Sequence, residues 1–113
     1  RGGEMWVRDG GRFLGVADEA LGPRLAANLF ATLACLGQPR QIIAWYNTGV
    51  FLTTRESAIV QALRDLAGRG STVISCGVCL EHFNLINSLK VGRIGNMYEI
   101  INAQRNAAQV IRL

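Results

Sequence analysis

The fold is decided around the stretch Ile74-Ser75-Cys76-Gly77-Val78-Cys79-Leu80, where a short apolar run passes into a CxxC motif. The run predicts a buried strand over residues 72–75, and the residues after it read as the start of a helix. A thiol between a strand and a helix meets unpaired backbone N–H groups and the positive end of the helix dipole, which favour the thiolate. Because the thiolate is the reactive form, we expect chemistry at Cys76 and Cys79. Gly77 allows the backbone to approach a ligand or a small anion.

Strand-like and helix-like patterns alternate along the rest of the chain. Short apolar runs predict strands over residues 5–8, 41–46, 72–75 and 110–113. Helical spacing predicts one helix over 21–36, a second that follows a Thr53–Glu56 capping box and stops at Gly68 or Gly70, and a third from Asn96 onward. A short helix or two turns are expected over 80–89, and irregular structure over 91–95. This alternation predicts an α/β domain with a mostly parallel sheet of four to five strands and helices on both faces.

The first long helix carries a stripe of leucines. We expect its buried face to be formed by Leu21, Leu25, Leu29, Leu33 and Leu36. Cys35 lies within the same pattern and is predicted to be a small core residue without a chemical role.

Composition limits the classes of function. The chain has 113 residues, enough for one domain, and its net charge of +4 comes from scattered arginines and a single lysine, so no nucleic-acid site is expected. No apolar stretch approaches the ~20 residues that span a bilayer, and the amino terminus lacks a signal-peptide profile, so we expect a cytoplasmic protein with no membrane association. In a reducing compartment a CxxC indicates redox, sulfur-carrier or metal chemistry rather than a structural bridge.

Polar residues follow the predicted strands. The carboxyl ends of parallel strands share one edge of the sheet, which predicts that Asp9, Asn47 and Cys76 lie near one another. We expect hydrogen bonds around the sulfur pocket from Asn47, Thr48, Asn96 and Tyr98. Two other roles are as well supported, in which Asn47 shapes a turn and Asn96 caps a helix.

The single histidine extends the motif to CxxCxxH. The chain offers no second ligand pair at zinc-site spacing, so the sequence predicts neither a metal site nor a cofactor. We interpret His82 as an exposed surface histidine rather than a group that modulates a thiol.

Three separated motifs resemble the carboxy-terminal domain of YedF-type proteins in the DsrE-like superfamily. They are NTGVFLT at 47–53, SCGVCL at 75–80, and VG at 91–92 followed by NMYEI at 96–100, and the similarity runs in order from Leu14 to Leu113. The resemblance implies a three-layer α/β/α DsrE-like domain and a link to sulfur relay or selenium metabolism. It places the persulfide-carrying position of the superfamily on Cys76, whereas Cys79 belongs to the YedF-like CGxC pattern.

The same resemblance implies partners. Relatives assemble as homo-oligomers or hetero-oligomers, so we expect a homo-oligomer. YedF proteins also carry an amino-terminal TusA-like domain, which we expect to be absent from a single DsrE-like domain over residues 1–113, with a separate TusA-like sulfur carrier as a candidate partner.

Two functions from different classes stay open. The first is a sulfurtransferase-like relay that carries a persulfide on the strand-end cysteine and passes it on by thiol exchange, with or without catalytic turnover. The second is a non-catalytic binding or regulatory module that uses the same pocket for a small ligand or a protein partner.

Overall fold

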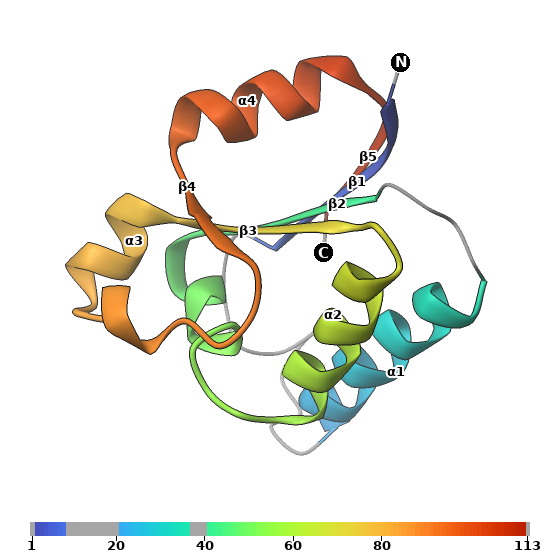
Figure 1. Ribbon diagram of the computed structural model, residues 1–113, viewed down its shortest axis with the longest axis horizontal. Helices are drawn as coiled ribbons and strands as arrows, with labels where there is room; N and C mark the ends of the chain where they lie inside the picture. Colours follow the sequence, from blue (N-terminus) through green and yellow to red (C-terminus); the bar gives the residue numbers. More distant parts are fainter. Residues whose placement is uncertain (1, 9–20, 37–40, 113) are drawn as a thin grey trace.

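The computed structural model describes residues 2–8, 21–36 and 41–112 of the chain (Figure 1). In chain order its elements are β1 (Gly2–Arg8), α1 (Leu21–Cys35), β2 (Ile42–Trp45), the 3₁₀ helix η1 (Asn47–Leu52), α2 (Ala58–Gly68), β3 (Thr72–Cys76), α3 (Gly77–His82), the 3₁₀ turn η2 (Ile86–Ser88), β4 (Arg93–Gly95), α4 (Met97–Asn106) and β5 (Ala107–Arg112). None of the helices in these ranges is long and apolar enough to cross a membrane.

The strands form one sheet in the order β4-β3-β2-β1-β5, and all four pairings are parallel. The chain builds the sheet outward from β1 to β4 and then returns along α4 to add β5 at the other edge. Helices α1 and α2 cover one face, and α4 covers the other (Figure 1). The predicted α/β architecture, with a parallel sheet between helical layers, is confirmed.

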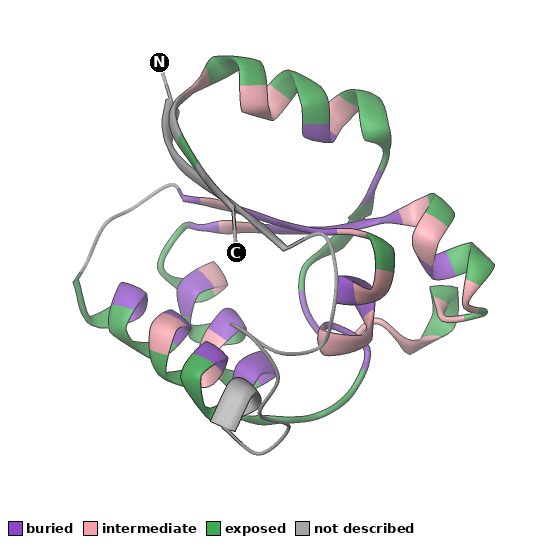
Figure 2. Cartoon of the chain, turned by 180° about the vertical axis from the view of Figure 1, so that it is seen from behind, coloured by how far each residue is buried: buried purple, intermediate pink, exposed green. Residues whose placement is uncertain are grey.

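Two hydrophobic cores of unequal size lie on the two faces of the sheet. Alternate residues of β2 and β3 point to opposite faces, so Ile43 and Val73 face α1 and α2, while Ala44 and Ile74 face α4. Among the residues whose burial the structure describes, the cluster on the α4 side consists of Ala44, Ile74, Cys76 and Ile100. Figure 2 shows the contrast, since α4 is mostly exposed whereas α1 and α2 turn several buried residues toward the sheet. Cys76 therefore belongs to the smaller of the two described clusters, on the α4 face.

The buried face of α1 differs from the expected leucine stripe. The residues that pack against the sheet are Ala26, Phe30, Leu33 and Ala34, whereas Leu25 is 42% exposed and Leu36 is 64% exposed. The Phe30 ring packs on Trp45 with 5.5 Å between ring centroids. An aromatic pair buries more apolar area than a leucine, so it sets the rotation of the helix. The same rotation leaves Cys35 exposed, so its predicted place in the core is wrong.

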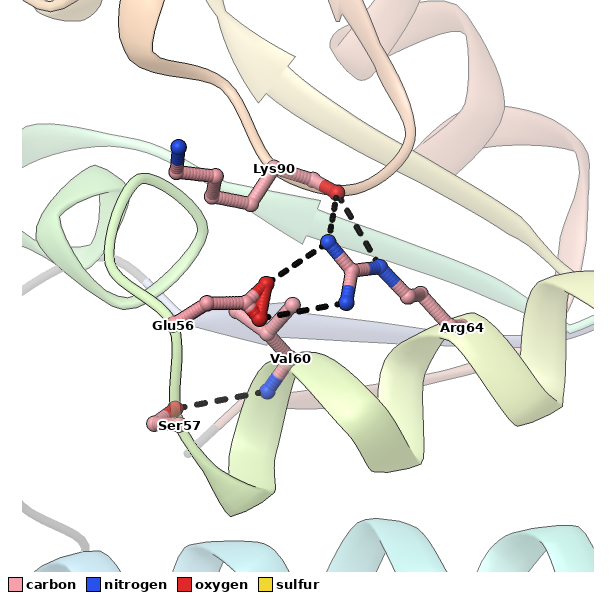
Figure 3. A network of polar contacts seen from close by, with 5 residues as sticks. All are labelled: Glu56, Ser57, Val60, Arg64 and Lys90. Atoms are coloured by element: carbon pink, nitrogen blue, oxygen red, sulfur yellow. Dashed lines mark hydrogen bonds and ion pairs between the residues drawn. The ribbon is translucent and has the colours of Figure 1, made fainter.

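Helix α2 starts at a cap other than the predicted Thr53–Glu56 box. The Ser57 hydroxyl accepts a hydrogen bond from the Val60 N–H at 3.4 Å. Glu56 instead pairs with Arg64 at 2.7 Å, and the same guanidinium donates to the Lys90 carbonyl oxygen at 3.0 and 3.3 Å (Figure 3). This network ties the first turns of α2 to the segment that leads into β4.

Strand β4 was predicted to be irregular. It has three residues at the edge of the sheet, and it pairs with β3 through Ile74↔Arg93, Ser75↔Ile94 and Cys76↔Gly95. A strand this short carries too few residues to show the alternation that identifies strands in a sequence.

Candidate functional site

The CxxC motif joins β3 to α3 at the carboxyl edge of the sheet. Cys76 is the last residue of β3 and Gly77 is the first residue of α3. Because Ile74 points toward α4, Cys76 two residues later does so too, and its side chain is only 1% exposed. Cys76 therefore does not open onto solvent at the edge of the sheet: its side chain lies in the small core with Ala44 and Ile100.

Cys79 lies one helical turn later and is half-buried. Its sulfur accepts a hydrogen bond from the backbone N–H of Asn47, with a nitrogen–sulfur distance of 3.0 Å. Asn47 begins η1, separated from the end of β2 by Tyr46 alone, and its φ of +57° lies in the left-handed region. Asparagine tolerates this conformation better than most residues. The ends of the neighbouring strands β2 and β3 thus meet, as predicted for Asn47 and the motif.

Both cysteines are free thiols, and Cys76 lies close enough to Cys79 to influence the pKa of its thiol. Burial raises the pKa of the Cys79 thiol, the Asn47 N–H lowers it in part, and the hydrogen bond and charge of Cys76 raise it again, so the pKa lies above its ordinary value of 9.0. Cys79 is therefore protonated at neutral pH.

A buried pair of hydroxyls supports the motif from the other face of the sheet. The hydroxyls of Thr53 and Ser75 are 2.8 Å apart, and both side chains are fully buried. The Thr53 hydroxyl also donates to the Val50 carbonyl oxygen at 3.1 Å. These bonds fasten the end of η1 to β3 one residue before Cys76. This pair is not predictable from the sequence, in which its one signal is a serine inside an apolar strand.

We expect Ser75→Ala and Thr53→Val each to lower the free energy of unfolding by about 1–3 kcal/mol, because each leaves a buried hydroxyl without its partner. The double variant should lose less than the sum of the two, since it removes both polar groups together. Urea unfolding of the four proteins measures this coupling. Strictly additive losses would contradict the proposed pairing.

Gly77 has little free space around it. A methyl group there would lie 3.0 Å from Cγ2 of Ile94 and 3.2 Å from the Gly95 carbonyl oxygen. The close approach that glycine permits is therefore between α3 and β4. The structure shows packing at this position, where the sequence suggested a ligand.

The other predicted ligand residues are only partly gathered. Thr48 follows Asn47 in η1 and is half-buried. The Asn96 side chain accepts the Glu99 N–H at 2.8 Å, so it caps α4, as the alternative interpretation held. Tyr98 is 80% exposed and lines a separate hollow of about 310 Å³ on α4. Asp9 lies outside the described residues.

His82 lies at the end of α3 and is exposed, as predicted. Its ring packs edge-on against Phe83, with 4.9 Å between ring centroids. Within the ranges that the structure describes, no three His, Cys, Asp or Glu side chains gather in a way that would hold a metal ion.

Comparison with known proteins identifies the fold. No protein-family model matches the chain, and no curated protein matches it in sequence. Among solved structures, the YchN protein from E. coli superposes with a TM-score of 0.70 at 19% identity, covering 97% of this chain and 98% of that one. The chain has a DsrE-like fold.

Two further structures extend the DsrE-like match. Protein BT1422 of unknown function from Bacteroides thetaiotaomicron has a TM-score of 0.70 at 11% identity, covering 97% of this chain and 94% of its own. Protein MTH1491 of unknown function from Methanobacterium thermoautotrophicum has a TM-score of 0.65 at 21% identity, covering 98% and 97%. Identities this low establish the DsrE-like fold alone, so the likeness to YedF-type proteins stays a prediction.

Proposed function

We propose that this protein is a sulfur- or selenium-relay protein in which the Cys76–Cys79 pair carries a sulfane sulfur and passes it on by thiol exchange. The observation that carries this proposal is the meeting of two free thiols with a backbone N–H, which lies 3.0 Å from the Cys79 sulfur. An N–H group at this distance stabilises negative charge on sulfur. Both a thiolate and a persulfide react as anions, so this hydrogen bond favours the reactive form of either. The DsrE-like fold is consistent with such a role.

Each relay step is an exchange at sulfur without net oxidation. A cysteine thiolate attacks the terminal sulfur of a donor persulfide, a new S–S bond forms, and the donor leaves as a thiolate. The acceptor repeats the reaction, so its thiolate takes the terminal sulfur and the protein thiolate is restored. A reducing, cytoplasmic location suits this chemistry because it keeps the pair unbridged.

One observation favours the second candidate, a non-catalytic binding module. Burial raises the pKa of the Cys79 thiol, which disfavours its thiolate, and Cys76 is only 1% exposed, which restricts the approach of a donor to its sulfur. A module of this kind would use the same edge of the sheet to bind a partner and would leave both sulfurs unmodified.

Intact-protein mass spectrometry after incubation with glutathione persulfide separates the two functions. At early times, before any sulfur is released as sulfide, we expect the protein to gain the mass of one sulfur atom, and the double variant Cys76→Ala/Cys79→Ala to gain none. Cys35 is exposed and distant in sequence, so Cys35→Ser is the matched control and should load as the parent does. If the parent stays unmodified at every donor concentration, the binding module replaces the relay.

Self-association is a further part of the proposal. Large apolar side chains are exposed along α4 and at the neighbouring edge strand, namely Ile94, Met97, Tyr98 and Ile101. Such a cluster suits contact with a second copy of the chain, and a TusA-like carrier remains a candidate partner from the resemblance alone. Light scattering at micromolar concentrations tests this, and a monomer mass throughout would contradict it.

A further inference from the structure

The two cysteines of the motif differ in access. Cys76 is 1% exposed beneath α4, whereas Cys79 is half-buried on α3. A nucleophile must reach the donor along the line of the bond that breaks, and a bulky persulfide cannot approach a sulfur enclosed by Ala44, Ile74 and Ile100. Access therefore favours Cys79, although the resemblance points to Cys76.

Hydrogen bonding favours the same residue. The backbone N–H of Asn47 points at the Cys79 sulfur and stabilises the anion there. The accessible sulfur is thus also the one that has a donor to hold its charge.

Given the relay function proposed above, we propose that Cys79 accepts the sulfane sulfur, that Cys76 is the resolving thiol, and that the Asn47 N–H positions the reacting sulfur. In the first step the Cys79 thiolate attacks the terminal sulfur of the donor, and the donor departs as a thiolate. The result is a persulfide on Cys79 with its terminal sulfur directed away from the buried Cys76.

The buried neighbour gives this persulfide a second exit. The Cys76 thiolate attacks the Cys79 sulfur, the bond to the terminal sulfur breaks, and hydrosulfide leaves as a Cys76–Cys79 disulfide forms. The two cysteines are oxidised and the sulfane sulfur is reduced. A dithiol then reduces the disulfide and is itself oxidised. The pair therefore delivers sulfur when an acceptor thiol is present and releases it as sulfide when none is.

The backbone of Asn47 has a specific part in this assignment. Its N–H reaches Cys79 because the residue adopts a φ of +57°, which glycine adopts freely and β-branched residues avoid. Asn47→Gly should keep the hydrogen bond without the side chain, whereas Asn47→Val should lose it.

Single-cysteine variants test the order of action, each in a Cys35→Ser background and each checked for folding by urea unfolding. After treatment with glutathione persulfide, Cys76→Ala should load one sulfur at least about tenfold faster than Cys79→Ala and should retain it. The parent should load, release sulfide and end as a disulfide that dithiothreitol reduces. Loading in Cys79→Ala but not in Cys76→Ala would overturn the assignment, whereas loading in no protein, the parent included, would refute the relay itself.

The rate of Cys79 alkylation as a function of pH gives a second test. Its midpoint would not shift if Cys76 and the Asn47 N–H had structural roles alone. Removal of Cys76 takes away the hydrogen bond and the charge that raise the pKa of Cys79, so the alkylation midpoint of Cys79 should fall in Cys76→Ala. In the same background Asn47→Val should raise the midpoint and Asn47→Gly should leave it in place. Equal midpoints for the two Asn47 variants would remove the positioning role of that N–H.

Discussion

Gly92→Ala is expected to lower the free energy of unfolding by at least about 2 kcal/mol and to loosen β4 from β3. Two physical effects act together. The φ of Gly92 is +75°, which disfavours any side chain, and a methyl group there would lie 2.3 Å from the Val73 carbonyl oxygen. That contact is with backbone inside β3, which cannot move aside without disturbing the strand that carries the motif. Urea unfolding measures the loss.

Substitutions at two other glycines separate the effect of backbone strain from that of a steric clash. Gly70 has a φ of +106° and open space around it, and Gly68 has open space without a positive φ. Gly70→Ala should therefore cost about 1–2 kcal/mol from strain alone, and Gly68→Ala should cost less than either of the other variants. Equal losses at Gly92 and Gly70 would show that the predicted contact with Val73 does not exist.

Ile100→Ala is the second substitution for which we expect a large loss in the free energy of unfolding. Ile100 is the one fully buried residue in α4, and it packs with Ala44, Ile74 and Cys76 in the small core. Its truncation should cost about 2–5 kcal/mol, because it removes buried apolar atoms and leaves a cavity in this core. Since the same side chain helps to cover Cys76, alkylation of Cys76 should also become faster. Urea unfolding and alkylation kinetics give the two readouts.

The adjacent residue is the control. Ile101 is 46% exposed on the same helix, so Ile101→Ala should change the free energy of unfolding by no more than about 0.5 kcal/mol and should leave Cys76 protected. A similar loss at both positions would mean that α4 is held by its outer surface instead of by this core.

The layered fold was predictable because its signals are local. Apolar runs that alternate with helical spacing imply a parallel sheet between helices. The strand predicted over residues 72–75 is observed as β3, which is one residue longer because it includes Cys76. The buried face of α1 was not predictable from spacing alone. Leu33 of the expected stripe is buried, but leucines at 25 and 36 fit a helical stripe as well as Phe30 does, and the contact of Phe30 with the Trp45 ring decides between them.

The site was predictable at the level of neighbourhood. The proximity of Asn47 to the motif was predictable, because both follow parallel strands whose carboxyl ends share one edge of the sheet. The sequence does not predict which face of the sheet Cys76 points to. A strand that is covered on both faces lacks the alternation of apolar and polar residues that would distinguish the two faces. The Asn47 N–H was also hidden, because a backbone group acquires its direction from a φ angle that the sequence does not specify.

The most direct test of the relay is the fate of one labelled sulfur atom. The protein is loaded from glutathione persulfide that carries an isotopic label in its terminal sulfur, freed of donor, and mixed with an acceptor protein that has one exposed thiol. Mass spectrometry then follows both chains. The account predicts that the label leaves the Cys76–Cys79 pair and appears on the acceptor at the same rate, with the parent thiols restored. Label that never enters the pair, or that enters and is neither transferred nor released as sulfide, would contradict it.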